Sequence, residues 1–470
     1  MTAIFDPQRY QRRVSAVTTF AVLVTFVFFA ALAYWQVFRS DIASSQGNPR
    51  LLADFARPGR GRILDRDGNA LAETTAEGTR VYHDASLAHV VGYLSARYGT
   101  QGAELAFNGI LSGSTAGSSF ADALNAEFRR DDPKGEDIRL TINRALQAVA
   151  VKALAGRRGA LVAIDPRTGE VLAMVSNPTF DPNTLETDGQ ALLQDPASPL
   201  LNRATQGLFP PGSTFKVVTA ISVLENNVIK PDTQVTCPGE IVIDGFPISC
   251  RNVPQGVGTY PFRNAFVFSV NAIFGQVGDK LGWERLLATA RKLGFDSAIP
   301  FMTETSRTQV FDDGAQLTRP LLASTAFGQG QLLATPLQMA QVAAAIANNG
   351  VLAAPHLGLD VVSNGKSVHA LESGSSRRVI SADVAATVKE MMVGVVDNAQ
   401  ANGVAISGVK IGGKTGTAES GRGTSHAWFI AFAPAENPVI AIAVVVEDGG
   451  QGGVVASPIA GTVIRAALGK

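Results

Sequence analysis

A serine and a lysine three residues apart stand out in the stretch PPGSTFKVVTA, which runs from Pro210 to Ala220. The two prolines end the preceding segment, Gly212 permits a sharp turn, and the apolar run predicts a helix that begins near Ser213. The Ser213 hydroxyl would then lie in the positive field of the helix N-terminus, with Lys216 one turn further on and facing the same way. Burial and nearby positive charge can make the neutral form of a lysine accessible, so the pair predicts a serine nucleophile and its base.

This spacing is a weak signal by itself, since about one such pair is expected by chance in a chain of this length. A second pair, Ser363 and Lys366, occurs in SNGK. Its Asn-Gly dipeptide indicates a surface turn, and no helical pattern follows it. We therefore interpret the second pair as a surface feature.

Two further short motifs follow, Ser-Val-Asn in FVFSVNAIF and Lys-Thr-Gly-Thr in the predicted strand IGGKTGTAE. Their residues are Ser269, Asn271, Lys414, Thr415, Gly416 and Thr417. Ser-x-x-Lys, Ser-x-Asn and Lys-Thr-Gly in this order are the signature of a serine acyl-transfer site. Structural alternatives exist for each motif, namely helix capping, a helix end and a solvated strand charge. The conjunction of all three favours chemistry.

The overall composition limits the possible functions. The chain has 470 residues, 46% hydrophobic and 17% charged, with 40 basic and 40 acidic side chains. A zero net charge gives no general electrostatic reason to expect a nucleic-acid partner. The histidines form no pair at metal-ligand spacing, and Cys237 and Cys250 have no metal-binding neighbours, so we expect no metal and no cofactor. The two cysteines form either a disulfide or two unpaired thiols.

Residues 14–38 form one long apolar run. As a helix it would be about 37 Å long, enough to cross a hydrocarbon core of about 30 Å. Three arginines precede it, which predicts a cytoplasmic tail over 1–13 and an extracytoplasmic remainder. The alternative is a cleaved signal peptide, but the run is longer than the usual apolar region of one. We expect a single-pass protein of the cell membrane.

The remaining pattern predicts an N-terminal part over 39–143 and a catalytic part over 144–470. Turn signals within 57–74 and 159–177 each indicate a hairpin. Helical patterns then dominate, before strands and a last helix return at the end of the chain. We therefore expect one α/β (α+β) catalytic domain in which helices flank a sheet.

Local signals predict individual helix ends and the roles of other residues. Thr335 should cap a helix, and either Asn143 or Thr141 should cap another. His426 and Trp428 follow the Lys-Thr-Gly strand, and we expect them to be structural rather than catalytic. For the arginines of GRGR, Arg60 and Arg62, structural and partner contacts are both open.

The three motifs and several longer segments resemble class B penicillin-binding proteins. These segments are GRILDRDGNALA, HVVGYLSARYGTQGAELAFNGILSG, AIDPRTGEVLAMVS and GQGQLLATPLQMA. The stretch KTGTAESGRGTSHAWFIAFAP resembles the actinobacterial septal and growth-zone members. The resemblance covers nearly the whole chain and implies a serine β-lactamase-like transpeptidase fold with an N-terminal pedestal for dimerisation or interaction. The residues before the catalytic part are too few for the glycosyltransferase domain of class A members.

The resemblance implies a role for each motif residue in acylation. Ser213 would attack the carbonyl between two D-alanines of a stem peptide, and Lys216 would take its proton. Ser269 would relay a proton to the leaving D-alanine. Asn271 would hold the substrate's side-chain amide and orient Lys216.

The Lys-Thr-Gly-Thr segment is implied to bind substrate. Lys414 would add positive field for the substrate carboxylate, and the hydroxyls of Thr415 and Thr417 would bind it. Gly416 would leave room for a substrate that lies along the strand. Backbone N–H groups of Ser213 and Thr417 would form the oxyanion hole.

The implied function is a D,D-transpeptidase that cross-links peptidoglycan stem peptides outside the membrane, is acylated by β-lactams and serves cell wall synthesis and division. The implied partners are a SEDS-type membrane glycosyltransferase and other division or elongation proteins. One alternative is a hydrolase, either a D,D-carboxypeptidase or a β-lactamase, which would deacylate with water. Another is a non-catalytic β-lactam-binding scaffold or sensor, although no motif is lost.

Overall fold

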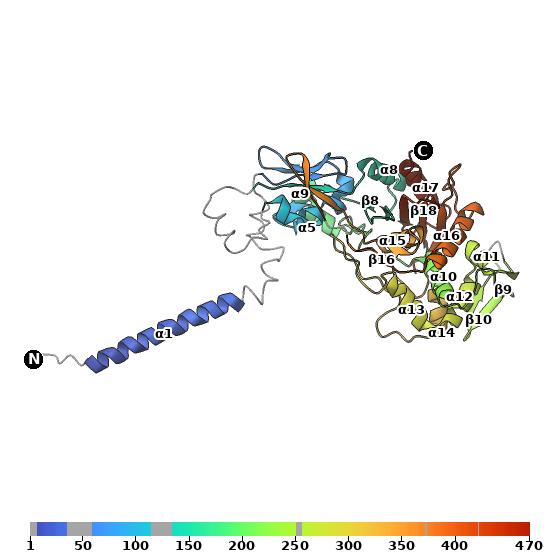
Figure 1. Cartoon of the computed structure of the whole chain (residues 1–470), viewed down its shortest axis with the longest axis horizontal. Helices are drawn as coiled ribbons and strands as arrows, with labels where there is room; N and C mark the ends of the chain where they lie inside the picture. Colours follow the sequence, from blue (N-terminus) through green and yellow to red (C-terminus); the bar gives the residue numbers. More distant parts are fainter. Residues whose placement is uncertain (1–6, 35–58, 114–133, 251–255, 372–373, 422) are drawn as a thin grey trace, which may run out of the picture. The chain divides into compact units, whose positions relative to one another are not determined.

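The computed structural model of the chain describes residues 7–34, 59–113, 134–250, 256–371, 374–421 and 423–470 (Figure 1). The chain divides into two compact units, Met1–Arg57 and Pro58–Lys470. In the first unit, helix α1 spans Pro7–Ala33 and exposes apolar side chains such as Phe20 and Phe26. Among the residues described, no helix combines the length and the hydropathy that a membrane crossing requires. Residues 35–38 of the expected span lie outside the described ranges.

A five-stranded antiparallel sheet forms the core of the second unit, in the order β17-β18-β19-β7-β8. In that order, the strands are Gly412–Glu419, Ser425–Ala433, Ile440–Val446, Gly159–Ile164 and Val171–Asn177. Alternate residues of the central strands belong to two different hydrophobic clusters, one on each face. Because both faces are buried, these strands are apolar at nearly every position.

Helices cover both faces of this sheet, which confirms the predicted fold class. They are α8 (Arg144–Leu154) and α17 (Ala456–Ala467) on one face and α15 (Pro336–Ala347) on the other. Asn143 caps α8 by accepting a hydrogen bond from the Leu146 N–H, whereas the Thr141 hydroxyl binds the Val171 carbonyl. Thr335 caps α15, as predicted.

A group of helices and short strands lies between β8 and β17 in the sequence. Its helices are η4 (Gly212–Phe215), α10 (Lys216–Glu225), α11 (Phe262–Val267), α12 (Asn271–Leu281), α13 (Trp283–Lys292), α14 (Arg319–Ala326) and α16 (Ala382–Asp397). Its strands are β9 (Gln234–Cys237), β10 (Glu240–Ile243), β11 (Phe246–Ser249) and β12 (Gly258–Pro261). Figure 1 shows α10–α14 together with β9 and β10, away from α8 and α17. A disulfide joins Cys237 to Cys250, so the two cysteines are paired.

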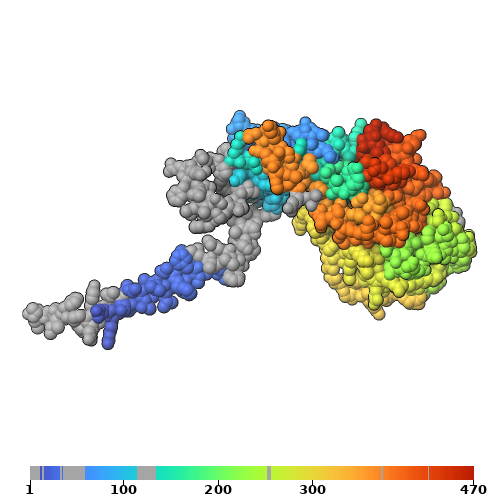
Figure 2. Space-filling model, viewed as in Figure 1, coloured from blue at the N-terminus to red at the C-terminus, as the bar shows by residue number. Residues whose placement is uncertain are grey.

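A second sheet has six strands in the order β15-β14-β6-β1-β2-β3. In that order, the strands are Lys366–Ala370, Gly358–Ser363, Asp137–Leu140, Ile63–Leu64, Ala70–Thr74 and Arg80–Tyr82. The hairpin predicted within 57–74 is confirmed as β1 and β2. The β14–β15 hairpin, orange in Figures 1 and 2, lies among the blue N-terminal elements. This sheet therefore combines strands from both sides of the expected boundary at residue 143.

Shorter elements complete the unit. They are η2 (Ala85–Leu87), α4 (Ala88–Val91), β4 (Leu94–Ser95), β5 (Gly99–Thr100), α5 (Gly102–Ala106), α6 (Asn108–Leu111), η3 (Pro182–Thr184), α9 (Leu185–Gln194), β13 (Val351–Leu352) and β16 (Arg377–Arg378). Two of them, β13 and β16, pair with each other in a separate two-stranded sheet. Arg60 is buried and donates to Glu104 and Asn108, so its contacts are structural. Arg62 is half-exposed and pairs with Asp137.

Candidate active site

The turn that carries Ser213 is tighter than the sequence indicated. Residues 212–215 form the 3₁₀ helix η4, and the regular α-helix α10 begins only at Lys216. Gly212 has a φ of +56°, and a Cβ there would lie 2.8 Å from the Thr417 carbonyl oxygen. Glycine thus lets the turn pass close to β17, where Ser213 remains partly exposed.

The Lys216 amine is buried among oxygen atoms of the turn that precedes α12. Its Nζ lies 2.7 Å from the Ser269 carbonyl oxygen, 3.0 Å from Ser269 Oγ and 2.6 Å from Asn271 Oδ1. Burial, and then the nearby charge of Lys414, hold the pKa of Lys216 well below its usual range. The neutral amine can accept a proton, which is the property that a base beside a serine needs.

Ser269 lies in the short connection between α11 and α12. Its φ is +60°, a conformation that is uncommon for a residue with a side chain. Its backbone N–H donates to the Phe266 carbonyl, and its carbonyl and Oγ both face Lys216. Ser269 Oγ also lies 3.0 Å from Lys414 Nζ, so one hydroxyl contacts both lysines.

Lys414 is fully buried on β17 and is therefore not a solvated strand charge. Its amine donates to Ser269 Oγ and to the Thr415 carbonyl, at 3.0 and 3.1 Å. Burial lowers the pKa of Lys414 to about 7. The amine therefore exchanges its proton near neutral pH and does not carry a fixed charge.

The two threonines of β17 differ in their surroundings, and Gly416 packs closely between them. Thr417 is exposed and lines the adjacent cleft, whereas Thr415 is half-buried with its methyl group beside Gly453. A Cβ on Gly416 would lie 2.8 Å from the Pro211 carbonyl oxygen and 3.0 Å from Thr214 Cγ2. Gly416 thus allows β17 to contact η4, a packing reason in addition to the expected clearance for substrate.

A cleft of about 940 Å³ opens beside these residues. Several elements contribute to its lining. This lining includes Pro210, Asn271, Phe327, Thr417 and Glu419, the β11 residues Phe246, Pro247, Ile248 and Ser249, Ser324 of α14, the loop residues Gln329 and Gly330, and Ser420, Gly421 and Ser425 between and at the ends of β17 and β18. Asn271 and Thr417 thus line the cleft, while the three motifs contact one another through Lys216, Ser269 and Lys414.

Sequence reasoning missed the loop of Gln329 and Gly330 as part of the site. A Cβ on the preceding Gly328 would lie only 1.7 Å from the Gly212 carbonyl oxygen, so the loop packs directly against η4. The only sequence signal for this loop is the stretch GQGQLLATPLQMA, whose family resemblance does not indicate a chemical role.

The other residues considered from the sequence have structural contacts. Trp428 is fully buried, and its Nε1–H donates to the Pro210 carbonyl at 2.9 Å. His426 Nδ1 accepts a hydrogen bond from the Asp448 N–H. Ser363 and Lys366 lie at the β14–β15 turn, far from α10 in the fold. Within the described ranges, no group of three or more potential metal ligands is present.

The fold and the three convergent motifs define a serine acyltransferase of the penicillin-binding type. The penicillin binding protein transpeptidase domain family matches residues 159–465, and the penicillin binding protein A dimerisation domain family matches residues 60–138. The chain therefore belongs to the penicillin-binding protein transpeptidases.

Individual relatives cover nearly the whole chain. The peptidoglycan D,D-transpeptidase PbpA of Mycolicibacterium smegmatis is 38% identical over an alignment of 490 residues, which covers 95% of this chain and 97% of that protein. PbpA of Mycobacterium tuberculosis is 37% identical, with 97% and 98% covered. The structure of penicillin-binding protein A from M. tuberculosis as a ceftriaxone acyl-enzyme complex has a TM-score of 0.79, 36% identity, and coverage of 89% of this chain and 100% of that chain. The predicted class B family is confirmed.

Proposed function

We propose that this chain is a peptidoglycan D,D-transpeptidase that cross-links stem peptides through a serine acyl-enzyme and is acylated by β-lactams. The buried Lys216 amine, held by Ser269 and Asn271 one turn beyond Ser213, carries the proposal. The names of the relatives and the acyl-enzyme form of one of them support it.

In the proposed acylation, Ser213 Oγ attacks the carbonyl carbon between two D-alanines, and the peptide C–N bond breaks. The Ser213 proton passes to neutral Lys216, and Ser269 relays a proton to the departing D-alanine nitrogen. Contact of Ser269 Oγ with Lys216 Nζ supports this relay. Backbone N–H groups of Ser213 and Thr417 stabilise the oxyanion, and one such donor typically contributes roughly a hundredfold in rate.

The proposed second step distinguishes a transpeptidase from a hydrolase. An amine of a neighbouring stem peptide attacks the acyl carbonyl, the new C–N bond forms, and the bond to Ser213 Oγ breaks. The proton lost by the amine returns to the serine oxygen. Attack by water at the same carbon would instead make the protein a carboxypeptidase or a β-lactamase.

We infer the substrate contacts from the family resemblance and from the residues that line the cleft. Asn271 holds a substrate amide, Lys414 and Thr415 contribute to the carboxylate subsite, and Thr417 binds the carboxylate directly. The positions of Asn271 and Thr417 in the cleft lining support this assignment. Gly416 leaves room for a substrate that lies along the strand and also lets β17 lie against η4.

We also propose the arrangement of the chain at the membrane. Residues 1–13 form a cytoplasmic tail, 14–38 a signal-anchor, 39–143 the pedestal and 144–470 the transpeptidase domain. The apolar sequence of α1, the preceding arginines and the disulfide, which persists in oxidising compartments, support an extracytoplasmic catalytic part. The partner that makes the glycan is a SEDS-type glycosyltransferase, and the setting is cell division.

The mass of the full chain in detergent, with and without benzylpenicillin, tests the function. One adduct should form on the parent protein and on Ser363→Ala, the serine of the other Ser-x-x-Lys pair, but none on Ser213→Ala. Slow loss of the adduct is expected of a transpeptidase, whereas rapid loss would indicate a β-lactamase. An adduct that survives Ser213→Ala, or no adduct at all, would overturn the catalytic assignment and favour a scaffold.

A further inference from the structure

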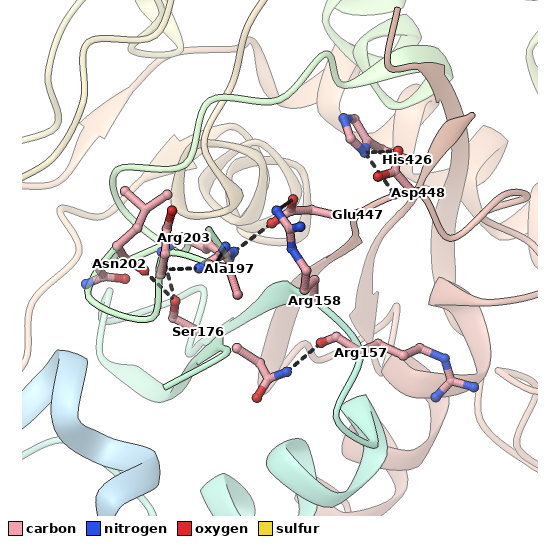
Figure 3. A network of polar contacts seen from close by, with 12 residues as sticks. Arg157, Arg158, Ser176, Ala197, Asn202, Arg203, His426, Glu447 and Asp448 are labelled. Carbon is pink, nitrogen blue, oxygen red and sulfur yellow. Dashed lines mark hydrogen bonds and ion pairs between the residues drawn. The ribbon is translucent and has the colours of Figure 1, made fainter. Parts of the chain in front are cut away.

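The glycine-rich segment 447–453, EDGGQGG, follows β19 and belongs to none of the catalytic motifs. Its first residue, Glu447, is held firmly. The carboxylate accepts from Arg203 Nε at 2.6 Å and from Arg158 at 2.7 Å (Figure 3). Arg203 is only 1% exposed and also donates to the carbonyls of Ala197 and Ser198. The two arginines therefore anchor Glu447, the first residue of the segment.

The next residue, Asp448, connects the segment to the turn between β17 and β18. Its backbone N–H donates to His426 Nδ1 at 3.1 Å, and its carboxylate accepts from the Thr424 hydroxyl. Figure 3 shows the His426–Asp448 part of this network beside the Glu447 part. Thr424 in turn hydrogen-bonds Ser420, and Ser420 and Ser425 line the cleft. Asp448 thus supports, through Thr424, the part of the cleft wall that Ser420 and Ser425 form.

The end of the segment reaches Thr417 itself. The Gly452 N–H donates to Thr417 Oγ1 at 3.4 Å. A hydroxyl has one proton and two lone pairs, so a donor on one lone pair turns the hydroxyl proton away from Gly452. A Cβ on Gly452 would lie 2.1 Å from the Trp428 carbonyl oxygen and 2.3 Å from that of Gly416, so only glycine permits this approach.

We propose that Asp448 is a positioning residue for the substrate-carboxylate subsite. Through Thr424 it holds Ser420 at the cleft wall, and through the segment that continues to Gly452 it directs the Thr417 hydroxyl into the cleft. Asp448 acts through these residues and does not touch the reacting atoms. The inference rests on the proposed function, because it takes Thr417 as the ligand of the carboxylate.

Thr424→Val tests the proposal, because valine keeps the shape of threonine and removes the hydroxyl. Rapid-mixing acylation of the full chain in detergent separates the initial Kd for benzylpenicillin from the limiting acylation rate. The Kd should rise about three- to tenfold, the effect of one lost hydrogen bond, with the rate within about twofold. Thr424→Ser should restore the Kd. Acylation by benzylpenicillin methyl ester, which lacks the free carboxylate, should differ little between Thr424→Val and the parent protein.

Two further variants sharpen the test. Asp448→Ala should raise the Kd as Thr424→Val does, and the double variant should add little, because both changes remove the same contact. Thr462→Val is the matched control, since this exposed α17 threonine binds only the Pro458 carbonyl in its own helix among the bonds described. It should leave both constants unchanged.

Three results would overturn the inference. The first is that Thr424→Val and Thr462→Val have the same Kd for benzylpenicillin. The second is that Thr424→Val lowers only the limiting acylation rate, and the third is that it weakens acylation by the methyl ester as much as acylation by benzylpenicillin. Failure of the parent protein to form any adduct would overturn the proposed function itself, and the two failures are therefore distinguishable.

Discussion

Two buried lysines lie on either side of one hydroxyl. Lys216 and Lys414 each place Nζ 3.0 Å from Ser269 Oγ. Burial penalises the charged form of both amines, and the charge of Lys414 is a further cause that lowers the pKa of Lys216. Burial therefore favours the neutral form of Lys216, which a base requires, while Lys414 titrates near neutrality.

The pKa of about 7 for Lys414 predicts a pH dependence of binding. A lysine is charged below its pKa, so raising the pH from about 6 to about 8 removes positive charge from the carboxylate subsite. The Kd for benzylpenicillin, measured by rapid mixing, should rise about three- to tenfold over this range.

Lys414→Arg should abolish that dependence, because arginine stays charged at every pH used. Lys389→Arg, at a half-buried lysine on α16, should keep the dependence of the parent protein. A parent Kd that is flat with pH, or an unchanged profile in Lys414→Arg, would contradict the assignment.

At the scale of elements, the site depends on the close contact of three backbones. The η4 turn lies between β17 and the loop that follows α14, and glycines stand where the chains meet. A Cβ on Gly212, Gly416 or Gly328 would come within 3 Å of a carbonyl oxygen of a neighbouring segment. These approaches place Ser213 on the turn beside β17, and Thr417 and Gln329 line one cleft.

Gly416→Ala should therefore damage the protein through packing. The added Cβ meets the backbone of Pro211 and the side chains of Thr214 and Trp428. We expect a loss of about 1–3 kcal/mol in the free energy of unfolding, measured with urea, and slower acylation by benzylpenicillin. Gly394→Ala in α16 is the control, since its Cβ would meet only Val267 Cγ2, at 3.0 Å. Equal stabilities of the two variants would show that β17 can move away from η4 at little cost.

At the scale of the whole molecule, the N-terminal sheet is completed by a hairpin from the catalytic part. β14 pairs with β6 over residues 358–362, and Arg139 on β6 binds Asp360 on β14 through both carboxylate oxygens. The two functional parts are thus joined through shared backbone pairing as well as through the chain.

A chain that begins at residue 144 should therefore be less stable than one that begins at residue 58. Loss of β6 leaves β14 with an unpaired edge, which favours aggregation, and leaves the Asp360 carboxylate without Arg139. We expect the thermal midpoint, measured by calorimetry, to fall by at least about 5 °C. Equal midpoints without aggregation would show that the catalytic part is stable without the N-terminal strands.

Local sequence patterns by themselves determined much of this protein. The apolar strand runs and the Asn143 and Thr335 caps predicted the fold class, and two of the motif residues, Asn271 and Thr417, line the cleft. These features depend on neighbours in the chain and on side-chain chemistry, so the sequence displays them directly.

Only the tertiary structure decided the features that join distant segments. It paired the two cysteines, placed β14 beside β6, brought the Gln329 loop to η4 and set Gly416 against the Pro211 carbonyl. It also buried Lys414 and so lowered its pKa to about 7. Burial, backbone approach and electrostatic environment depend on residues far apart in the chain, and no local pattern encodes them.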